Sequence, residues 1–459
     1  MRAFFLCGVA AVALGAATGS SSAADLPRRM PVKAAPPVVT YDWSGFYIGG
    51  YYGTAVEHAK GQTDGVISGV AGVNDMALTA GGTVGYNWQF APRWLVGLEA
   101  DIGFMGVDHT FKQWSSPTIT GSKADWDATV RARFGYVTGP SLLYVTGGAA
   151  FVHITDTFGG DGFPVAAPAI ANTTTKTGWT AGGGIETKLS RNWSAKTEYL
   201  FIDVGTTSFV SNPFGILAGT TFDHSYHVIK TGLNYKIDGN WEGLPFFSTA
   251  MLPSDHNWQG FYAGLNVGGG ISLMRGINDV RGELDMNGTG LAAGGQVGYN
   301  YMLGGRWFVG VEGDVGYLGV NSSTTAWANT FDIFTAKTDW YATARARFGT
   351  TTGPALLYFT AGGAWVGLKD GFAFVPTSAG VDISSKTASG WTIGGGTEVA
   401  LDARWSAKIE SLYIDVGHTN HSDLVPAPFF LADFKERFMV VRAGLNYKFG
   451  VDPIVTARY

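Results

Sequence analysis

Pairs of charged residues with the same spacing occur twice in this sequence. Arg131 and Arg133 stand two residues apart in "DWDATVRARFG", and the letters "RARFG" return at 345–349. Glu99 and Asp101 show the same spacing in "GLEADIG", which returns as "GVEGDVG" in the second half of the chain. Paired arginines could bind phosphate or nucleic acid, and paired carboxylates could take part in acid–base catalysis. The elements that carry these residues decide between such roles.

The composition excludes a typical nucleic-acid-binding protein. The chain has 459 residues, a net charge of −5 and no block of lysine and arginine. Charged residues make up 15%, against a usual fraction of about 25%, while aromatic residues reach 14% and glycines number 67. This composition is typical of a secreted, periplasmic or outer-membrane protein rather than of a nucleic-acid-binding domain.

The first residues have the features of a targeting segment. Residues 1–24 begin with Arg2, continue with an apolar core and end in small residues, which indicates a secretory signal peptide. Cys7, the single cysteine, lies inside this segment, so we expect no disulfide and no thiolate chemistry in the mature chain. Residues 25–42 are basic and rich in proline, as expected of a periplasmic tether. No later stretch is long and apolar enough for a transmembrane helix.

The remainder of the chain repeats itself once. "WSGFYIGG" at 43–50 matches "WQGFYAGL" at 258–265, and "WSAKTEYLFIDVG" at 193–205 matches "WSAKIESLYIDVG" at 405–417. Within each unit, apolar residues alternate with small or charged residues at a period of two, which predicts strands. We expect eight strands per unit, beginning near residues 45, 76, 94, 125, 142, 175, 193 and 221, and again near 260, 290, 307, 338, 356, 387, 405 and 433.

The connections between these strands alternate in length. Short ones such as "QFAPR" at 89–93 and "TGPS" at 138–141 alternate with long ones. The long connections are expected near residues 58–75, 108–124, 158–174 and 206–221. Short turns on one side and long loops on the other are typical of a transmembrane, antiparallel up-and-down barrel of the outer membrane. The predicted fold class is therefore all-β.

One strand face carries charges that match in sign between the two units. Because an arginine in lipid costs about 2–4 kcal/mol at mid-membrane, this face must point into the barrel. Each unit has four acids and four bases there, so we expect a salt-bridged plug, with a solute or ion filter as the alternative. The residues are Glu99, Asp101, Arg131, Arg133, Glu186, Lys196, Glu198 and Lys230 in the first unit, and Glu312, Asp314, Arg345, Arg347, Glu398, Lys408, Glu410 and Arg442 in the second.

Aromatic residues near the strand ends predict girdles at the two membrane interfaces, with ordinary core packing as the alternative. They are Trp43, Trp94, Trp126, Trp193 and Tyr235 in the first unit, and Trp258, Trp307, Trp340, Trp405 and Tyr447 in the second.

The eight histidines argue against shared catalytic or metal chemistry. None occupies equivalent positions in the two units, and most fall in predicted loops, so a catalytic or metal-binding histidine common to both is excluded. We expect no enzymatic activity, no catalytic residues, no metal and no cofactor. His153, His224 and His227 are candidate ligands if the protein binds haem.

The junction between the units favours two barrels over one. Residues 239–256 form a long, proline-containing linker where a hairpin turn would be short. We therefore predict eight-stranded barrels over 43–238 and 257–450, joined by a periplasmic linker and followed by a tail at 451–459. A single 16-stranded barrel with a water-filled channel is the alternative.

The motifs "DWSGFYIGG", "GYNW", "DWDATVRARFG" and the closing "GLNYK" resemble the OmpA-like outer-membrane β-barrel family, in its porin-type branch from alphaproteobacteria. The resemblance covers nearly all of the mature chain, twice, and implies a multi-pass protein of the Gram-negative outer membrane. It implies lipid, lipopolysaccharide and the barrel-assembly machinery as partners; no nucleic acid is expected, and the oligomeric state stays open. A structural role in the envelope with surface-displayed loops is expected, with a porin or an adhesin or ligand-binding protein as alternatives.

Overall fold

The computed structural model describes residues 41–64, 68–112, 119–160, 167–208, 220–238, 256–278, 282–325, 332–374, 382–420 and 433–450. The predicted signal peptide, most of the tether and the linker, and the C-terminal tail lie outside these residues. Among the residues described, no helix is long and apolar enough to span a membrane.

The first half of the chain forms eight antiparallel strands that close on themselves. Each strand pairs with the next along the chain, and β8 returns to β1 with Tyr47 opposite Lys236. The strands are β1 (Gly45–Asp64), β2 (Ser68–Ala91), β3 (Trp94–Lys112), β4 (Ile119–Thr138), β5 (Ser141–Gly160), β6 (Ala167–Lys188), β7 (Trp193–Ser208) and β8 (Thr220–Lys236).

The second half repeats this arrangement with one interruption. β11 and β12 both pair with β10 on one side and β13 on the other, so they are two pieces of one broken strand. β17 closes onto β9, with Lys448 opposite Tyr262. The strands are β9 (Gly260–Asn278), β10 (Gly282–Gly304), β11 (Trp307–Leu318), β12 (Asn321–Thr325), β13 (Asp332–Thr352), β14 (Ala355–Phe374), β15 (Asp382–Ala400), β16 (Trp405–Asn420) and β17 (Asp433–Lys448).

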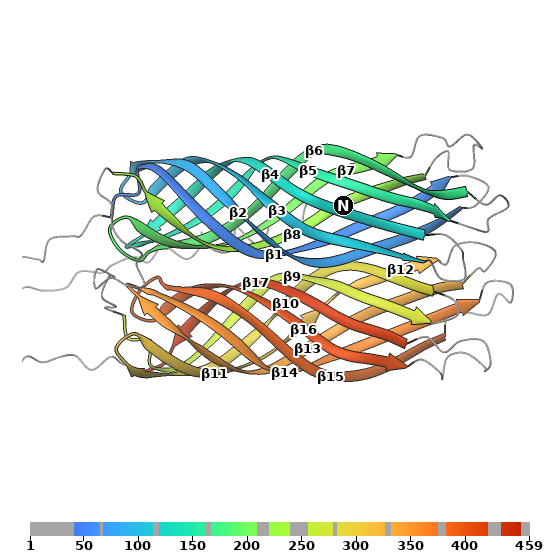
Figure 1. The fold of residues 1–459 in the computed structure, drawn as a ribbon. Coiled ribbons are helices and arrows are strands. Elements are labelled where there is room, and N and C mark those ends of the chain that lie inside the picture. The colour runs from blue at the N-terminus through green and yellow to red at the C-terminus, as the bar shows by residue number, and fades with distance from the viewer. Residues whose placement is uncertain are drawn as a thin grey trace, which may run out of the picture.

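These registers confirm two barrels and contradict the single 16-stranded alternative. A single barrel would require β8 to share a full ladder with β9 and β17 to close onto β1. Instead, β8 pairs along its length with β1, and β17 pairs along its length with β9. Figure 1 shows the two cylinders lying side by side with their long axes roughly parallel.

The strands extend further into the predicted long connections than expected. β2 begins at Ser68 and β4 at Ile119, whereas the sequence placed their starts near 76 and 125. The predicted loop at 58–75 is mostly strand, because Thr54 through Asp64 pair continuously with β2. Polar residues occur there at both parities, as Glu57 and Lys60 do, so the sequence shows no clear apolar face. The remaining tips of the long connections lie outside the described residues.

The two faces of each strand differ as the alternation predicts. On β3, the outward Leu98 and Ile102 are 65% and 63% exposed, and the inward Glu99 between them is 1% exposed. Because lipid can contact the first kind of side chain and not the second, the exposed apolar surface is the membrane-facing side. Inside the barrel, tyrosine side chains lie directly against glycines of neighbouring strands. A Cβ built at Gly85 would lie 2.3 Å from the Tyr47 hydroxyl.

A seam joins the outer faces of the two barrels. Val56 of β1 packs against Ile271 and Leu273 of β9, and all three are buried. The Thr197 and Thr397 hydroxyls lie 2.9 Å apart, and the Asn74 backbone N–H donates to the Asp285 carboxylate at 3.0 Å. The residues that make this seam therefore do not face lipid.

Candidate functional site: the charge networks of the two lumens

All sixteen charged residues singled out from the sequence lie in the two barrel interiors, and each is at most 6% exposed. They come from β3, β4, β6, β7 and β8 in the first barrel and from β11, β13, β15, β16 and β17 in the second. Alternation along paired strands brings them to one level of each cylinder. The structure therefore assembles both sets into compact networks.

Arg131 is the centre of the first network. Its Nη2 contacts Glu99 at 2.6 Å and Asp101 at 2.5 Å, and its Nη1 lies 3.0 Å from Glu198. Its Nε donates to the Thr129 hydroxyl at 2.8 Å. One guanidinium thus connects three carboxylates from β3 and β7.

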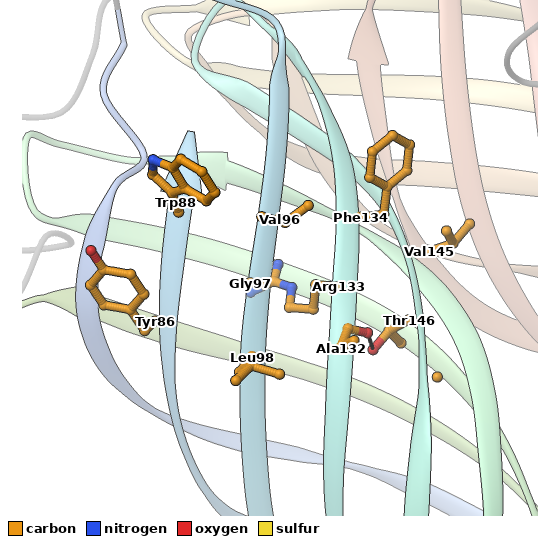
Figure 2. A pocket seen from close by; sticks show the side chains of 11 residues that line it. Tyr86, Trp88, Val96, Gly97, Leu98, Ala132, Arg133, Phe134, Val145 and Thr146 are labelled. Atoms are coloured by element: carbon orange, nitrogen blue, oxygen red, sulfur yellow. Dashed lines mark hydrogen bonds between the residues drawn. The ribbon is translucent and has the colours of Figure 1, made fainter. Parts of the chain in front are cut away.

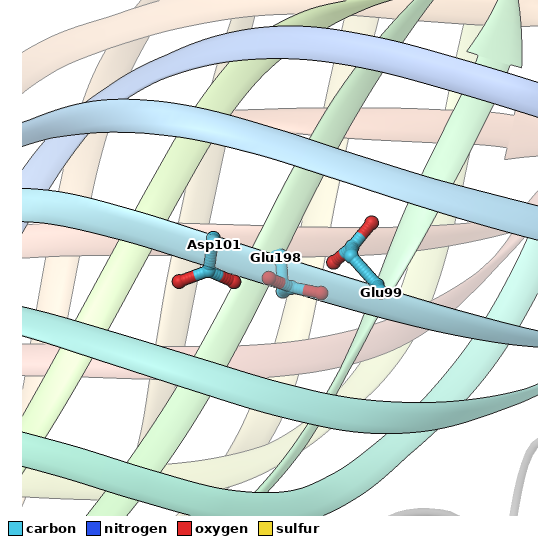
Figure 3. A group of neighbouring side chains, drawn as sticks. All are labelled: Glu99, Asp101 and Glu198. Carbon is cyan, nitrogen blue, oxygen red and sulfur yellow. The ribbon is translucent and has the colours of Figure 1, made fainter.

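Three of these groups have the spacing of a metal site. The carboxylate oxygens of Glu99, Asp101 and Glu198 lie within 4.8 Å of one another, and Figure 3 shows the side chains close together in the lumen. Arg131 contacts all three at 2.5–3.0 Å, however. The positive charge that such a cluster requires is supplied here by a guanidinium.

Arg133 extends the network towards the short-turn end. Its Nη2 contacts Glu186 at 2.7 Å, and its Nη1 donates to the Tyr47 hydroxyl at 2.6 Å. The guanidinium also lies 4.0 Å from the centre of the Tyr144 ring, within cation–π range. Arg133 therefore packs among groups from β1, β5 and β6.

The two lysines complete the first network. Lys196 Nζ lies 2.9 and 3.0 Å from the two oxygens of Glu99, and Lys230 Nζ lies 2.8 Å from Asp101. Because buried charges are stable only when paired and hydrogen-bonded, the four bases and four acids hold the strands together across the lumen.

The second network repeats the first, with one larger base. Arg345 contacts Glu312 at 2.5 Å, Asp314 at 2.7 Å and Glu410 at 2.9 Å, as Arg131 does in the first barrel. Arg442 replaces Lys230 and reaches both Asp314 at 3.0 Å and Glu410 at 2.6 Å. The second barrel is therefore the more extensively cross-linked of the two.

A further polar layer in the first barrel was missed from the sequence. His224 lies between two carboxylates, with Nδ1 3.2 Å from Glu57 and Nε2 3.2 Å from Asp156. Ser122 and Tyr226 donate to Glu57 at 2.7 and 3.1 Å. These residues fall in or beside predicted loops, so the parity of the strands was not extended to them.

Asp127 was also missed, for a different reason. It is 1% exposed and lies on the same inward face of β4 as Arg131. The sequence comparison kept only positions that are charged in both units, and Tyr341 stands at the matching place in the second. Parity alone would have found it.

The aromatic girdles are only partly where the sequence placed them. Trp43 and Trp258 are 5% and 4% exposed and pack inside their barrels, against Leu95 and Phe308 respectively, so the girdle prediction is wrong for both. Each of these tryptophans stands two residues before its opening strand and turns inward over the lumen, so strand parity does not predict its direction. Trp193 and Tyr235, 9% and 7% exposed, belong to a buried cluster that also contacts Leu357 of the second barrel.

The other predicted girdle residues are more accessible. Trp307, Trp340 and Trp405 are 52%, 37% and 44% exposed on the outer surface of the second barrel. Trp94, Trp126 and Tyr447 are intermediate in exposure. Several stack on neighbouring rings, as Trp94 does on Phe134 at 5.2 Å.

The three candidate haem ligands do not converge. His153 lies on β5, and His224 and His227 lie on β8. His153 stacks on Trp126, His224 is enclosed by Glu57 and Asp156, and His227 accepts or donates a hydrogen bond with the Tyr199 hydroxyl at 2.8 Å. No pair of them faces a common space among the described residues.

The outer surface of the first barrel carries a shallow apolar groove. Figure 2 shows Tyr86 and Trp88 on one side and Phe134 and Val145 on the other, with the small residue Gly97 between them. These side chains belong to the exposed apolar surface, so the groove faces the membrane rather than the lumen.

Closed antiparallel cylinders with an apolar outside and a charged inside define an integral outer-membrane barrel protein. The chain belongs to the outer membrane protein beta-barrel domain family, whose model matches it twice, over residues 9–236 and 244–449.

Three similar proteins each match about half of the chain. The 31 kDa outer-membrane immunogenic protein of Brucella melitensis biotype 1 is 34% identical over 230 residues, which cover 47% of this chain and 93% of the relative. The 22 kDa outer membrane protein of Rhizobium leguminosarum bv. viciae is 29% identical over 206 residues, 44% of this chain and 82% of the relative. Neisserial surface protein A matches with 13% identity over 42% of this chain and 98% of its own, at a TM-score of 0.25.

Proposed function

We propose that this protein is a structural component of the outer membrane, made of two plugged barrel domains over 43–238 and 257–450 joined by the linker 239–256. In this proposal neither lumen passes solutes. The long-connection ends of the strands face the cell exterior and display their tips there.

The observation that carries the proposal is that side chains fill the lumen from wall to wall. In the first barrel, the charge network lies between two apolar layers. One contains Trp43, Leu95 and Tyr144, and the other contains Met105, Leu200 and Val228. An eight-stranded barrel is just wide enough to be filled by side chains, so a filled lumen is what this strand number favours.

The relatives support the surface-display part of the proposal. The Brucella melitensis relative is named an immunogenic outer-membrane protein. If the same holds here, the strand ends on the long-connection side reach the cell surface, where antibodies can bind them. Surface labelling of intact cells at engineered cysteines near the tips, such as Lys112→Cys, tests this orientation.

Solute flux tests the plug directly. The full chain, refolded into liposomes, is expected to swell in isotonic sugar no faster than empty liposomes, and to give no stable conductance step in a planar bilayer. An open porin of the outer membrane serves as the positive control. Swelling well above the empty liposomes, or a large and stable open channel, would establish the porin alternative instead.

A further inference from the structure

The first lumen contains one more acid than base at the level of its charge network. The acids are Glu99, Asp101, Asp127, Glu186 and Glu198, and the bases are Arg131, Arg133, Lys196 and Lys230, so 5 − 4 leaves one negative charge. The second barrel has four of each at this level, because Tyr341 occupies the place of Asp127. At this level the two barrels therefore differ by one buried charge.

Asp127 has no partner for this charge. It is 1% exposed, and among the described residues neither carboxylate oxygen has a hydrogen-bond partner on another residue. Arg131 is already paired with Glu99, Asp101 and Glu198. Lys230 is paired with Asp101, and its Nζ lies over the Tyr51 ring, 4.4 Å from the ring centre. A buried carboxylate without its own ion-pair or hydrogen-bond partner is costly, so a further positive charge beside Asp127 would be stabilising.

The hydroxyl of Tyr51 is a second unsatisfied group at the same place. It is buried and has no hydrogen-bond partner within the part of the chain that the structure describes. Asp127 lies directly opposite Gly103 in the β3–β4 ladder, and a Cβ built at Gly103 would lie 2.2 Å from this hydroxyl. The phenol and the carboxylate thus lie side by side on the inner wall without bonding each other.

The second barrel fills the equivalent place with its own groups. Tyr341 lies over Gly316, the counterpart of Gly103, with a ring carbon 3.0 Å from a Cβ built there. Its hydroxyl accepts a hydrogen bond from Arg442 Nη1 at 2.6 Å. The guanidinium of Arg442 also bonds Glu410 through Nε and Nη2. In the first barrel the shorter Lys230 leaves Glu198 Oε1 without a hydrogen bond among the described residues.

We propose that the first barrel binds one monovalent cation between the Asp127 carboxylate and the Tyr51 hydroxyl, at a site that the second barrel lacks. The ligand is a single small positive charge: a proton on the carboxyl, or an alkali ion such as Na⁺ held by the two oxygen groups. The other ionisable groups that act on Asp127 are Asp101, Arg131, Lys230 and Tyr226. Oxygen ligands and a single excess charge suit such an ion, and they offer too little charge for a divalent metal.

Two measurements on the full refolded chain distinguish the sources. For Na⁺, the unfolding equilibrium in urea is compared in NaCl and in N-methyl-D-glucamine chloride at equal ionic strength. At a Na⁺ concentration ten times its Kd, the wild type is expected to favour the folded state about tenfold more, and Asp127→Asn is expected to lose this effect. For a proton, the infrared difference spectrum between wild type and Asp127→Asn is expected to contain the carbonyl band of a neutral carboxyl.

Either result supports the site and identifies its cation. The proposal is overturned if wild type and Asp127→Asn respond equally to Na⁺ and show the same carboxyl bands. If Asp127→Asn fails to fold, the double variant Tyr51→Asn with Asp127→Tyr takes its place, because Asn266 and Tyr341 stand at these two positions in the second barrel. Tyr341→Phe is the matched control and is expected to leave both measurements unchanged.

Discussion

At the scale of single residues, the arginines are the groups on which each lumen depends. Arg131→Leu would remove the guanidinium that pairs with Glu99, Asp101 and Glu198. Removing one partner of a buried ion pair typically costs about 3–5 kcal/mol, and we expect a loss of that order in the free energy of unfolding. Urea titration of the protein in lipid vesicles, followed by heat-modifiable migration on a gel, measures it.

Lys123→Ala is the control for this prediction. Lys123 pairs with Asp125 at 3.0 Å, but both side chains are largely exposed, at 46% and 40%. Exposed pairs contribute little because water already solvates both charges. The urea midpoint should therefore stay that of the wild type, and a midpoint for Arg131→Leu that also stays in place would show that the network is not a structural element.

The same scale shows what the sequence could predict and what it could not. Strand parity and repetition were enough to place sixteen charged residues inside, because a barrel wall leaves only two faces. They were not enough for Glu57 and His224, which lie close to the expected strand ends, nor for Asp127, which has no charged counterpart. The inward direction of Trp43 was not predicted, because this residue precedes its strand, where the period of two does not apply.

At the scale of elements, glycines on the inner wall decide whether the strands can approach the central tyrosines. A Cβ at residue 85 would lie 2.3 Å from the Tyr47 hydroxyl, which donates to Glu99 at 2.7 Å. Gly85→Ala must therefore displace Tyr47 from the network. Overpacking of this kind costs about 1–3 kcal/mol, and we expect a lower urea midpoint by that amount.

Gly50→Ala provides the comparison, since it adds the same methyl group to a neighbouring strand. The nearest atom to its Cβ would be the Gly81 carbonyl oxygen at 3.8 Å, an ordinary contact. We expect no loss of stability there. Equal midpoints for the two variants would show that the wall tolerates a methyl group beneath Tyr47.

At the scale of the whole molecule, the seam predicts that the barrels stay together without their covalent connection. The packing of Val56 on Ile271, and the hydrogen bond from Asn74 to Asp285, join the two outer surfaces directly. With a protease site inserted in the linker 239–256, the two fragments are expected to co-purify in mild detergent after cleavage. In lipid, close packing and hydrogen bonds rather than hydrophobic burial hold such surfaces together.

Ile271→Arg combined with Leu273→Arg tests the seam itself. Both side chains are 2% exposed at the contact, and charges there should separate the cleaved barrels. Fragments of the unmodified protein that separate as soon as the linker is cut would mean that the seam is a passive contact.

Because each barrel closes on itself, its first and last strands pair between residues that are less than 200 positions apart in the sequence. Tyr47 meets Lys236 in the first barrel, a separation of 236 − 47 = 189 residues, and Tyr262 meets Lys448 in the second, 448 − 262 = 186. One large cylinder would have to join Tyr47 to Lys448, 448 − 47 = 401 residues apart. Doubling a loop adds only about 0.6 kcal/mol of closure entropy, but long-range pairing slows folding. The first barrel can thus pair all of its strand edges without any strand of the second barrel, and none of its edges depends on the end of the chain.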